Sequence, residues 1–130
     1  MTITTERSIT LRYTGPIVSV NEWKQPRRGG GMMLSDRYRA FLGAIVAEFT
    51  AERVRQHWQP LDSPCAADIR VSLPRAWDTS NITKPLFDAL ELAGIVANDR
   101  LIHSYRVTRS AHETKRGHGD IEIWISGGEL

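Results

Sequence analysis

The feature that most constrains this chain is a change of hydrophobic period between residues 67 and 94. From Ala67 to Leu73 apolar and polar side chains alternate, which is the pattern of a half-buried strand, and Pro74 ends the run. Apolar residues then recur at steps of three and four until Gly94, a residue that commonly ends helices. The apolar stripe consists of Ile82, Leu86, Ala89, Leu90 and Ala93. A strand therefore leads into an amphipathic helix, which indicates a helix packed against a sheet.

Further strands and a second helix are predicted around this unit. Alternation indicates strands at Ser8–Tyr13, Leu101–Arg109 and Ile121–Ser126, and residues 17–20 either extend the first strand or re-enter the sheet. Ser35 and Asp36 can cap a helix whose apolar residues keep helical spacing to about His57. This order of elements predicts an α/β (α+β) protein: a single domain over residues 1–130, with a mixed sheet of about four to five strands and two main helices packed on it.

Three local features complete the predicted fold. Residues 24–34 are basic and then glycine-rich, without a core-forming pattern, and predict a mobile loop. Residues 111–119 are long enough for a hairpin connection between the last two strands. Pro85 is expected in the first turn of its helix, which puts the start of that helix between Ser80 and Lys84.

Charge and cysteine content narrow the environment. The net charge is only +2, but basic residues gather at 24–28 and 100–116, which indicates either a face for a polyanion such as nucleic acid or solvated surface charge. The single cysteine, Cys65, allows no internal disulfide and favours a reducing compartment. No signal peptide is visible and no segment has the roughly 20 apolar residues of a membrane span, so a soluble cytoplasmic protein is expected.

Polar residues flank the helix at 82–93 on both sides. Asp78-Thr-Ser-Asn81 precedes it and Asn98-Asp99 follows it, and both groups could be no more than a helix cap and a turn. If the helix lies against the neighbouring strands, however, Asp78 and Asp99 can meet beside Lys84. Two carboxylates and a lysine at one place could bind a hard divalent cation and hold a phosphate near it, which is the chemistry of phosphodiester cleavage.

The combination resembles the RusA-type Holliday-junction resolvases, whose hallmark is an acidic cluster followed by Asn, Lys, Asp-Ala-Leu, Gly-Ile and a final Asp. The matching residues are Asp78, Asn81, Lys84, Asp88-Ala89-Leu90, Gly94-Ile95 and Asn98-Asp99, and Pro16 to Trp23 is similar to the entry motif of that family. The resemblance implies a small homodimeric endonuclease, often encoded by phage or prophage, that cuts four-way DNA junctions with Mg²⁺ (or Mn²⁺) in recombination and repair. It implies catalytic roles for Asp78, Lys84 and Asp99, with both aspartates as metal ligands.

One position departs from the family pattern, because Ser80 stands where the family has an aspartate. A serine hydroxyl can ligate Mg²⁺ but brings no charge, and such sites depend on carboxylate count. Three outcomes are open. Asp78 and Asp99 suffice with Ser80 or a water; another acid substitutes, with Asp88 nearest by helix geometry and Glu22 more remote; or the protein binds DNA without cutting it.

The nucleic-acid contacts are expected at two places. Lys24, Arg27 and Arg28 in the basic loop are expected to touch phosphates, and Asn81 and Lys84 are expected to act at the helix start.

Other interpretations of single residues stay open. Lys84 could pair with Asp88 four residues on, and His103 is either an acid–base group or a surface residue. Trp77 is either a core residue or lies against DNA. A third interpretation of the whole chain is a small structural or interaction domain, for which the helix cap has no ligand.

Overall fold

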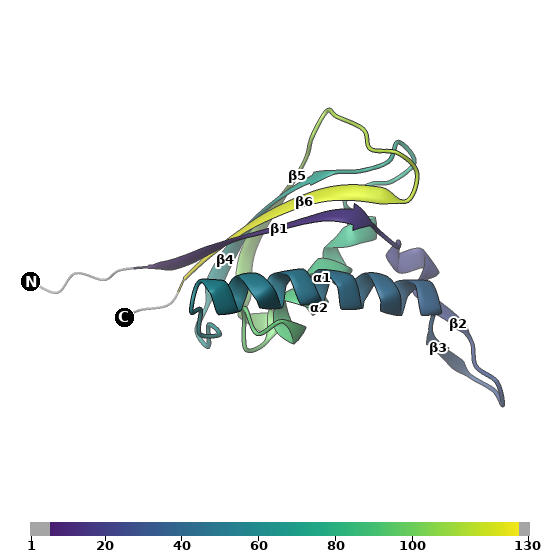
Figure 1. Cartoon of the computed structure of the whole chain (residues 1–130), viewed down its shortest axis with the longest axis horizontal. Coiled ribbons are helices and arrows are strands. Elements are labelled where there is room, and N and C mark those ends of the chain that lie inside the picture. Colours follow the sequence, from purple (N-terminus) through teal and green to yellow (C-terminus); the bar gives the residue numbers. More distant parts are fainter. Residues whose placement is uncertain (1–5, 128–130) are drawn as a thin grey trace, which may run out of the picture.

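The computed structural model describes residues 6–127, which fold around one mixed sheet (Figure 1). Its four strands are β1 (Arg7–Pro16), β4 (Cys65–Ser72), β5 (Ile102–Arg109) and β6 (His118–Gly127), in the order β1-β6-β4-β5. The strand β6 pairs antiparallel with both β1 and β4, whereas β5 pairs parallel with β4. The predicted α+β class and mixed sheet are confirmed.

Two helices, α1 (Asp36–Arg55) and α2 (Ser80–Leu92), lie on the same face of this sheet (Figure 1). The alternation predicted from sequence places one set of strand side chains between sheet and helices, where they are buried. Those of β6, for example, are Ile121, Ile123 and Ile125. Ser35 caps α1 as expected, because its side chain accepts a hydrogen bond from the Tyr38 N–H at 3.1 Å.

The basic, glycine-rich segment is a β-hairpin, so its prediction as an irregular mobile loop was wrong. Strand β2 (Lys24–Pro26) pairs antiparallel with β3 (Met32–Leu34). The run Gly29–Gly31 has positive φ at each residue, and the Arg27 N–H donates to the Gly31 carbonyl at 2.9 Å. The glycines therefore supply the left-handed backbone that this turn needs rather than general flexibility.

The last two strands are not joined as a hairpin, which corrects a second expectation. Because β4 lies between β5 and β6, the connection must cross the end of β4. It is held there by two hydrogen bonds, from the Ser110 N–H to the Val71 carbonyl at 2.8 Å and from the Thr114 N–H to the Leu73 carbonyl at 3.2 Å. The sheet order, which local pattern does not specify, decides this path.

Two smaller expectations also change. Residues 17–20 do not re-enter the sheet, because β1 ends at Pro16 and a short 3₁₀ helix, η1 (Val20–Glu22), follows. The helix α2 starts at Ser80 as expected, but Pro85 is its sixth residue and lies beyond the first turn. Pro85 is buried there, which is consistent with apolar packing compensating for the missing backbone donor.

No helix in residues 6–127 is long and apolar enough to cross a membrane.

Candidate active site

The start of α2 is organised by a set of short-range hydrogen bonds around Asp78. The Asn81 side-chain oxygen accepts from the Asp78 N–H at 2.9 Å, and Asp78 Oδ1 accepts from the Ser80 N–H at 3.0 Å and from the Ser80 hydroxyl. Thr79 is the N-cap residue, yet its side chain makes no capping bond. The capping interpretation is therefore correct for Asp78 and Asn81, which nevertheless leaves Asp78 exposed to solvent.

These contacts also set the charge state of Asp78. The hydroxyl of Ser80 is the largest influence that holds the pKa of the Asp78 carboxyl below its usual range, and the N–H groups of Ser80 and Asn81 and the positive charge of Arg109 act in the same direction. Asp78 is thus an ionised carboxylate at neutral pH. An anionic, oriented oxygen is what a hard cation requires.

Arg109 holds the loop that leads to Asp78, a role that sequence reasoning missed. From the end of β5 its guanidinium donates to the carbonyls of Pro74 at 2.7 Å and Leu73 at 3.5 Å, and to the carbonyl of Trp77. Arg109 was visible in the sequence only as one of several basic residues. Nothing local marks it as an anchor, because its partners lie more than thirty positions away.

A cavity of about 590 Å³ brings together three of the predicted residues: Ser80, Lys84 and Asp99. Its other lining residues are Thr79, Thr83, Phe87, Tyr105 and Val107. Ser80 lies between two carboxylates in contact terms, since it bonds to Asp78 and shares this cavity with Asp99.

Asp99 begins a second short 3₁₀ helix, η2 (Asp99–Leu101), and is held by an acid that sequence reasoning missed. Its N–H donates to Glu91 Oε1 at 2.9 Å. Asn98 accepts from the Arg100 N–H at 2.8 Å, so the turn interpretation is correct for Asn98. Glu91 shares the polar stripe of α2, but only the fold shows that it reaches the Asp99 backbone.

Lys84 pairs with Asp88 one turn along α2, as the alternative interpretation allowed. Its Nζ atom is 3.4 Å from Asp88 Oδ1, and the buried Tyr38 hydroxyl donates to Asp88 Oδ2, also at 3.4 Å. Burial, followed by the Asp88 charge and hydrogen bond, raises the pKa of Tyr38 to about 12. Asp88 is thus fixed from α1 and faces the amine of Lys84.

The remaining predicted residues lie apart from this cavity. Lys24, Arg27 and Arg28 are exposed on the β2–β3 hairpin, which projects beyond the α1 N-terminus (Figure 1). Trp23, just before the hairpin, packs edge-on against Tyr38 with ring centroids 6.0 Å apart, and Lys84 Nζ lies 5.7 Å from its ring. His103 is exposed at a bulge in β5.

Trp77 and Glu22 were also considered from the sequence. Trp77 is partly buried and packs against the core, in agreement with its simpler interpretation. Glu22 lies in η1 and lines a different cavity, together with Trp77.

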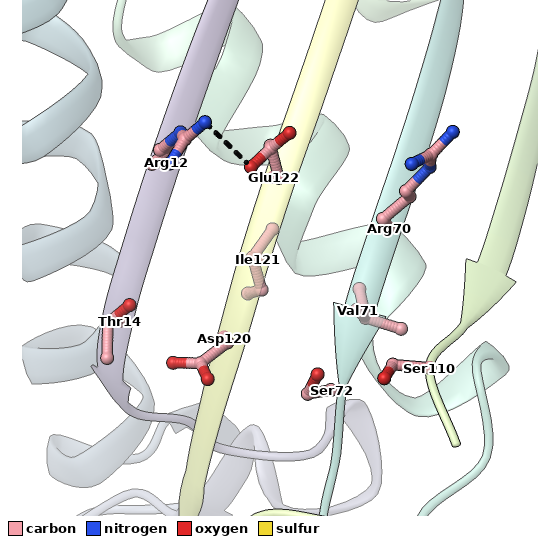
Figure 2. Close-up of a pocket in the computed structure, with 9 residues that line it drawn as sticks. All are labelled: Arg12, Thr14, Arg70, Val71, Ser72, Ser110, Asp120, Ile121 and Glu122. Atoms are coloured by element: carbon pink, nitrogen blue, oxygen red, sulfur yellow. Dashed lines mark ion pairs between the residues drawn. The ribbon is translucent and has the colours of Figure 1, made fainter. Parts of the chain in front are cut away.

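The opposite face of the sheet carries a separate cavity of about 400 Å³ (Figure 2). Arg12 and Glu122 form an ion pair across β1 and β6 at 3.1 Å, and Arg70 lies nearby on β4. None of the residues predicted from the sequence lines it. Exposed pairs of this kind contribute little stability, so this face is mixed in charge rather than a second active site.

A metal ion has to fit the donors that are present. Residues 6–127 hold no group of three or more His, Cys, Asp and Glu side chains suited to a metal. Mg²⁺, however, usually takes one or two protein carboxylates and keeps several waters. Asp78 and Asp99, with the Ser80 hydroxyl between them in contact terms, fit that smaller donor set.

Comparison with known proteins connects this geometry to a family. The family model described as endodeoxyribonuclease RusA matches residues 14–126, a span that includes the α2 start, the cavity and Asp99. No curated protein gives a match. Because the family model covers most of the chain, including every element that builds the cavity, the protein belongs to the RusA family of endodeoxyribonucleases.

Proposed function

We propose that this protein is a metal-dependent, structure-selective endodeoxyribonuclease that resolves four-way (Holliday) DNA junctions in recombination and repair. The observation that carries the proposal is the shared cavity of Ser80, Lys84 and Asp99 beside Asp78, in a chain of the RusA family. A cation, a lysine and oriented carboxylates at one place are what cleavage of a phosphodiester needs.

The residues divide the work as follows. Asp78 and Asp99 would hold Mg²⁺, or Mn²⁺ in its place, and the bound ion would polarise the scissile phosphate and activate a water. Lys84 stabilises the negative charge that develops on the phosphate. Ser80 and Asn81 keep Asp78 oriented through the hydrogen bonds described above. Asp88 restrains the Lys84 amine.

The β2–β3 hairpin is proposed to bind the DNA backbone. Its support is the exposure of Lys24, Arg27 and Arg28 on a projecting element. Contacts to phosphates give affinity with little sequence information. The hairpin therefore contributes to binding, and the cavity to cutting.

A homodimer is proposed as the working form. A symmetric junction calls for paired cuts, and a two-fold dimer supplies two sites related by the same symmetry. Light scattering of the purified protein tests this directly, because a monomer in the presence of the junction would contradict it.

A second candidate function is a junction-binding relative with weakened catalysis. It is favoured by one specific observation: the described residues hold no three-residue metal cluster, and the position of a family aspartate is taken by Ser80. Binding would then persist while Mg²⁺-dependent cutting is slow.

Cleavage of a labelled four-way junction in Mg²⁺, with Mn²⁺ in parallel, distinguishes the candidates. Paired symmetric nicks that Asp78→Asn and Asp99→Asn abolish support the endonuclease, with Asp62→Asn as an exposed-carboxylate control and linear duplex as the control substrate. Tight binding with cutting restored by Ser80→Asp supports the weakened relative. Absence of both binding and cutting would contradict both candidates.

A further inference from the structure

An exposed aromatic ring stands at the cavity shared by Ser80, Lys84 and Asp99, and the proposed function leaves it without a role. Tyr105 is 54 % exposed, and among the exposed large apolar side chains of residues 6–127 it is the aromatic one. An aromatic ring carries a large apolar surface, so its exposure beside a polar cavity suggests a ligand with an aromatic face of its own.

The ring is held in place rather than free. Tyr105 lies on β5, the edge strand of the sheet, in register with the buried Ala67, so its side chain is on the face that carries the helices. There it meets Phe87 of α2 nearly perpendicularly, with ring centroids 5.0 Å apart and an interplanar angle of 84°. The contact orients Tyr105 while more than half of its surface stays open to solvent.

The cavity has two chemically different parts. Lys84 and the hydroxyl residues Thr79, Ser80 and Thr83 supply a cation and hydrogen-bond donors, which suit a phosphate. Phe87 and Tyr105 supply an aromatic wall. A nucleotide presents these same two parts, a charged phosphate and a flat base, and every base has a face that can stack.

We propose that Tyr105, supported by Phe87, is a stacking platform for an unpaired nucleobase next to the phosphate held at Lys84. The inference rests on the proposed function and deepens it, because it names what the site recognises in branched DNA. In a linear duplex each base is already stacked on its neighbours, whereas at a branch point the cost of unstacking a base is lowest. The platform therefore favours a junction over a duplex.

The test uses a four-way junction with 2-aminopurine at the branch point, bound in EDTA so that no cutting occurs. Stacking quenches this fluorescent base. Tyr105→Ala and Tyr105→Leu are expected to give brighter complexes than the wild type and junction binding weaker by roughly 5- to 150-fold, the loss typical of one stacked base. Tyr105→Phe, which keeps the ring, should match the wild type, as should Leu92→Ala, which removes an equally exposed apolar residue.

The remaining results also decide the matter. Circular dichroism identifies any variant that fails to fold, and Tyr105→Leu retains apolar volume if Tyr105→Ala does not fold. Unchanged brightness and unchanged junction affinity in folded Tyr105→Leu would overturn the platform while leaving the nuclease proposal intact. If the substitution instead converts a dimer to a monomer in light scattering, the ring belongs to an interface between copies and the proposal is wrong. A wild-type protein that does not bind the junction at all would refute the proposed function itself.

Discussion

The hydroxyl of Ser80 donates a hydrogen bond to the Oδ1 carboxylate oxygen of Asp78, and the Ser80 N–H donates to the same oxygen at 3.0 Å. The residue that replaces a family aspartate thus orients the remaining carboxylate and holds its pKa below the usual range. In place of a second negative charge, the chain has one aspartate whose direction and ionisation are fixed. This relationship leads to the first prediction.

Ser80→Ala is expected to lower junction cleavage at limiting Mg²⁺ by roughly 10- to 100-fold, the usual cost of removing a hydrogen-bond partner from a metal-ligating side chain. Ser80→Asp should instead lower the Mg²⁺ concentration needed for half-maximal cleavage, because it adds a carboxylate. A Mg²⁺ titration of the cleavage rate measures both effects. Ser104→Ala, an exposed serine on β5, serves as the control. Identical titrations for Ser80→Ala and the wild type would show that Ser80 does not act on Asp78.

Asp88→Asn is expected to lower the cleavage rate without changing the Mg²⁺ requirement. The reason is that Asp88 contacts the Lys84 amine and the Tyr38 hydroxyl, each at 3.4 Å, so it is proposed to position Lys84 rather than to bind the metal. The rate at saturating Mg²⁺ and the half-maximal Mg²⁺ concentration separate the two roles. A large rise in the latter would make Asp88 a metal ligand.

Tyr38 predicts a loss of stability at alkaline pH. Its pKa is raised from 10.0 to about 12, chiefly by burial and then by Asp88, so the folded state favours the protonated phenol. The stabilisation is fully present below pH 10.0, the unfolded value, and is lost as the pH rises toward about 12. Denaturant unfolding at a series of alkaline pH values should therefore show a steeper decline for the wild type than for Tyr38→Phe. Parallel declines would contradict the shift.

The hairpin arginines predict a change in salt dependence. Replacing Arg27 and Arg28 together by Ala should reduce the slope of log affinity against log salt by up to about 2, since each lost phosphate contact removes about 0.9. Electrophoretic binding assays at several salt concentrations measure it. Arg55→Ala, in which the lost arginine pairs with Glu52 at the other end of α1, is the control and should leave the slope unchanged.

Arg109 predicts a coupling between stability and activity. Arg109→Ala removes the donor from three backbone carbonyls and should lower the free energy of unfolding by about 1–3 kcal/mol, with a loss of cleavage because the loop before Asp78 is released. Arg109→Lys should restore only part of both, since an amine cannot reproduce the planar fork. Thermal unfolding and junction cleavage test this together. Full activity in Arg109→Ala would mean that the loop holds its place without the anchor.

Much of the fold was readable from local pattern. The alternation in residues 67–73 and the apolar stripe at 82–93 predicted β4 and α2, because burial on one face imposes periods of two and of three to four. The hairpin at 24–34 was missed since three-residue strands carry too little alternation, and the glycine run, which is a turn, is equally typical of a loop.

The sequence by itself determined which residues stand at the start of α2 and that Asp78, Asn81 and Lys84 share that place, because hydrogen bonds and helical spacing over a few residues depend on local order. Only the tertiary structure decided that β5 lies beyond β4, that Arg109 reaches the Trp77 carbonyl, and that Tyr105 meets Phe87 at the cavity. Those contacts join segments distant in the chain. Their approach follows from the order of strands in the sheet and the packing of the core, which no local pattern encodes.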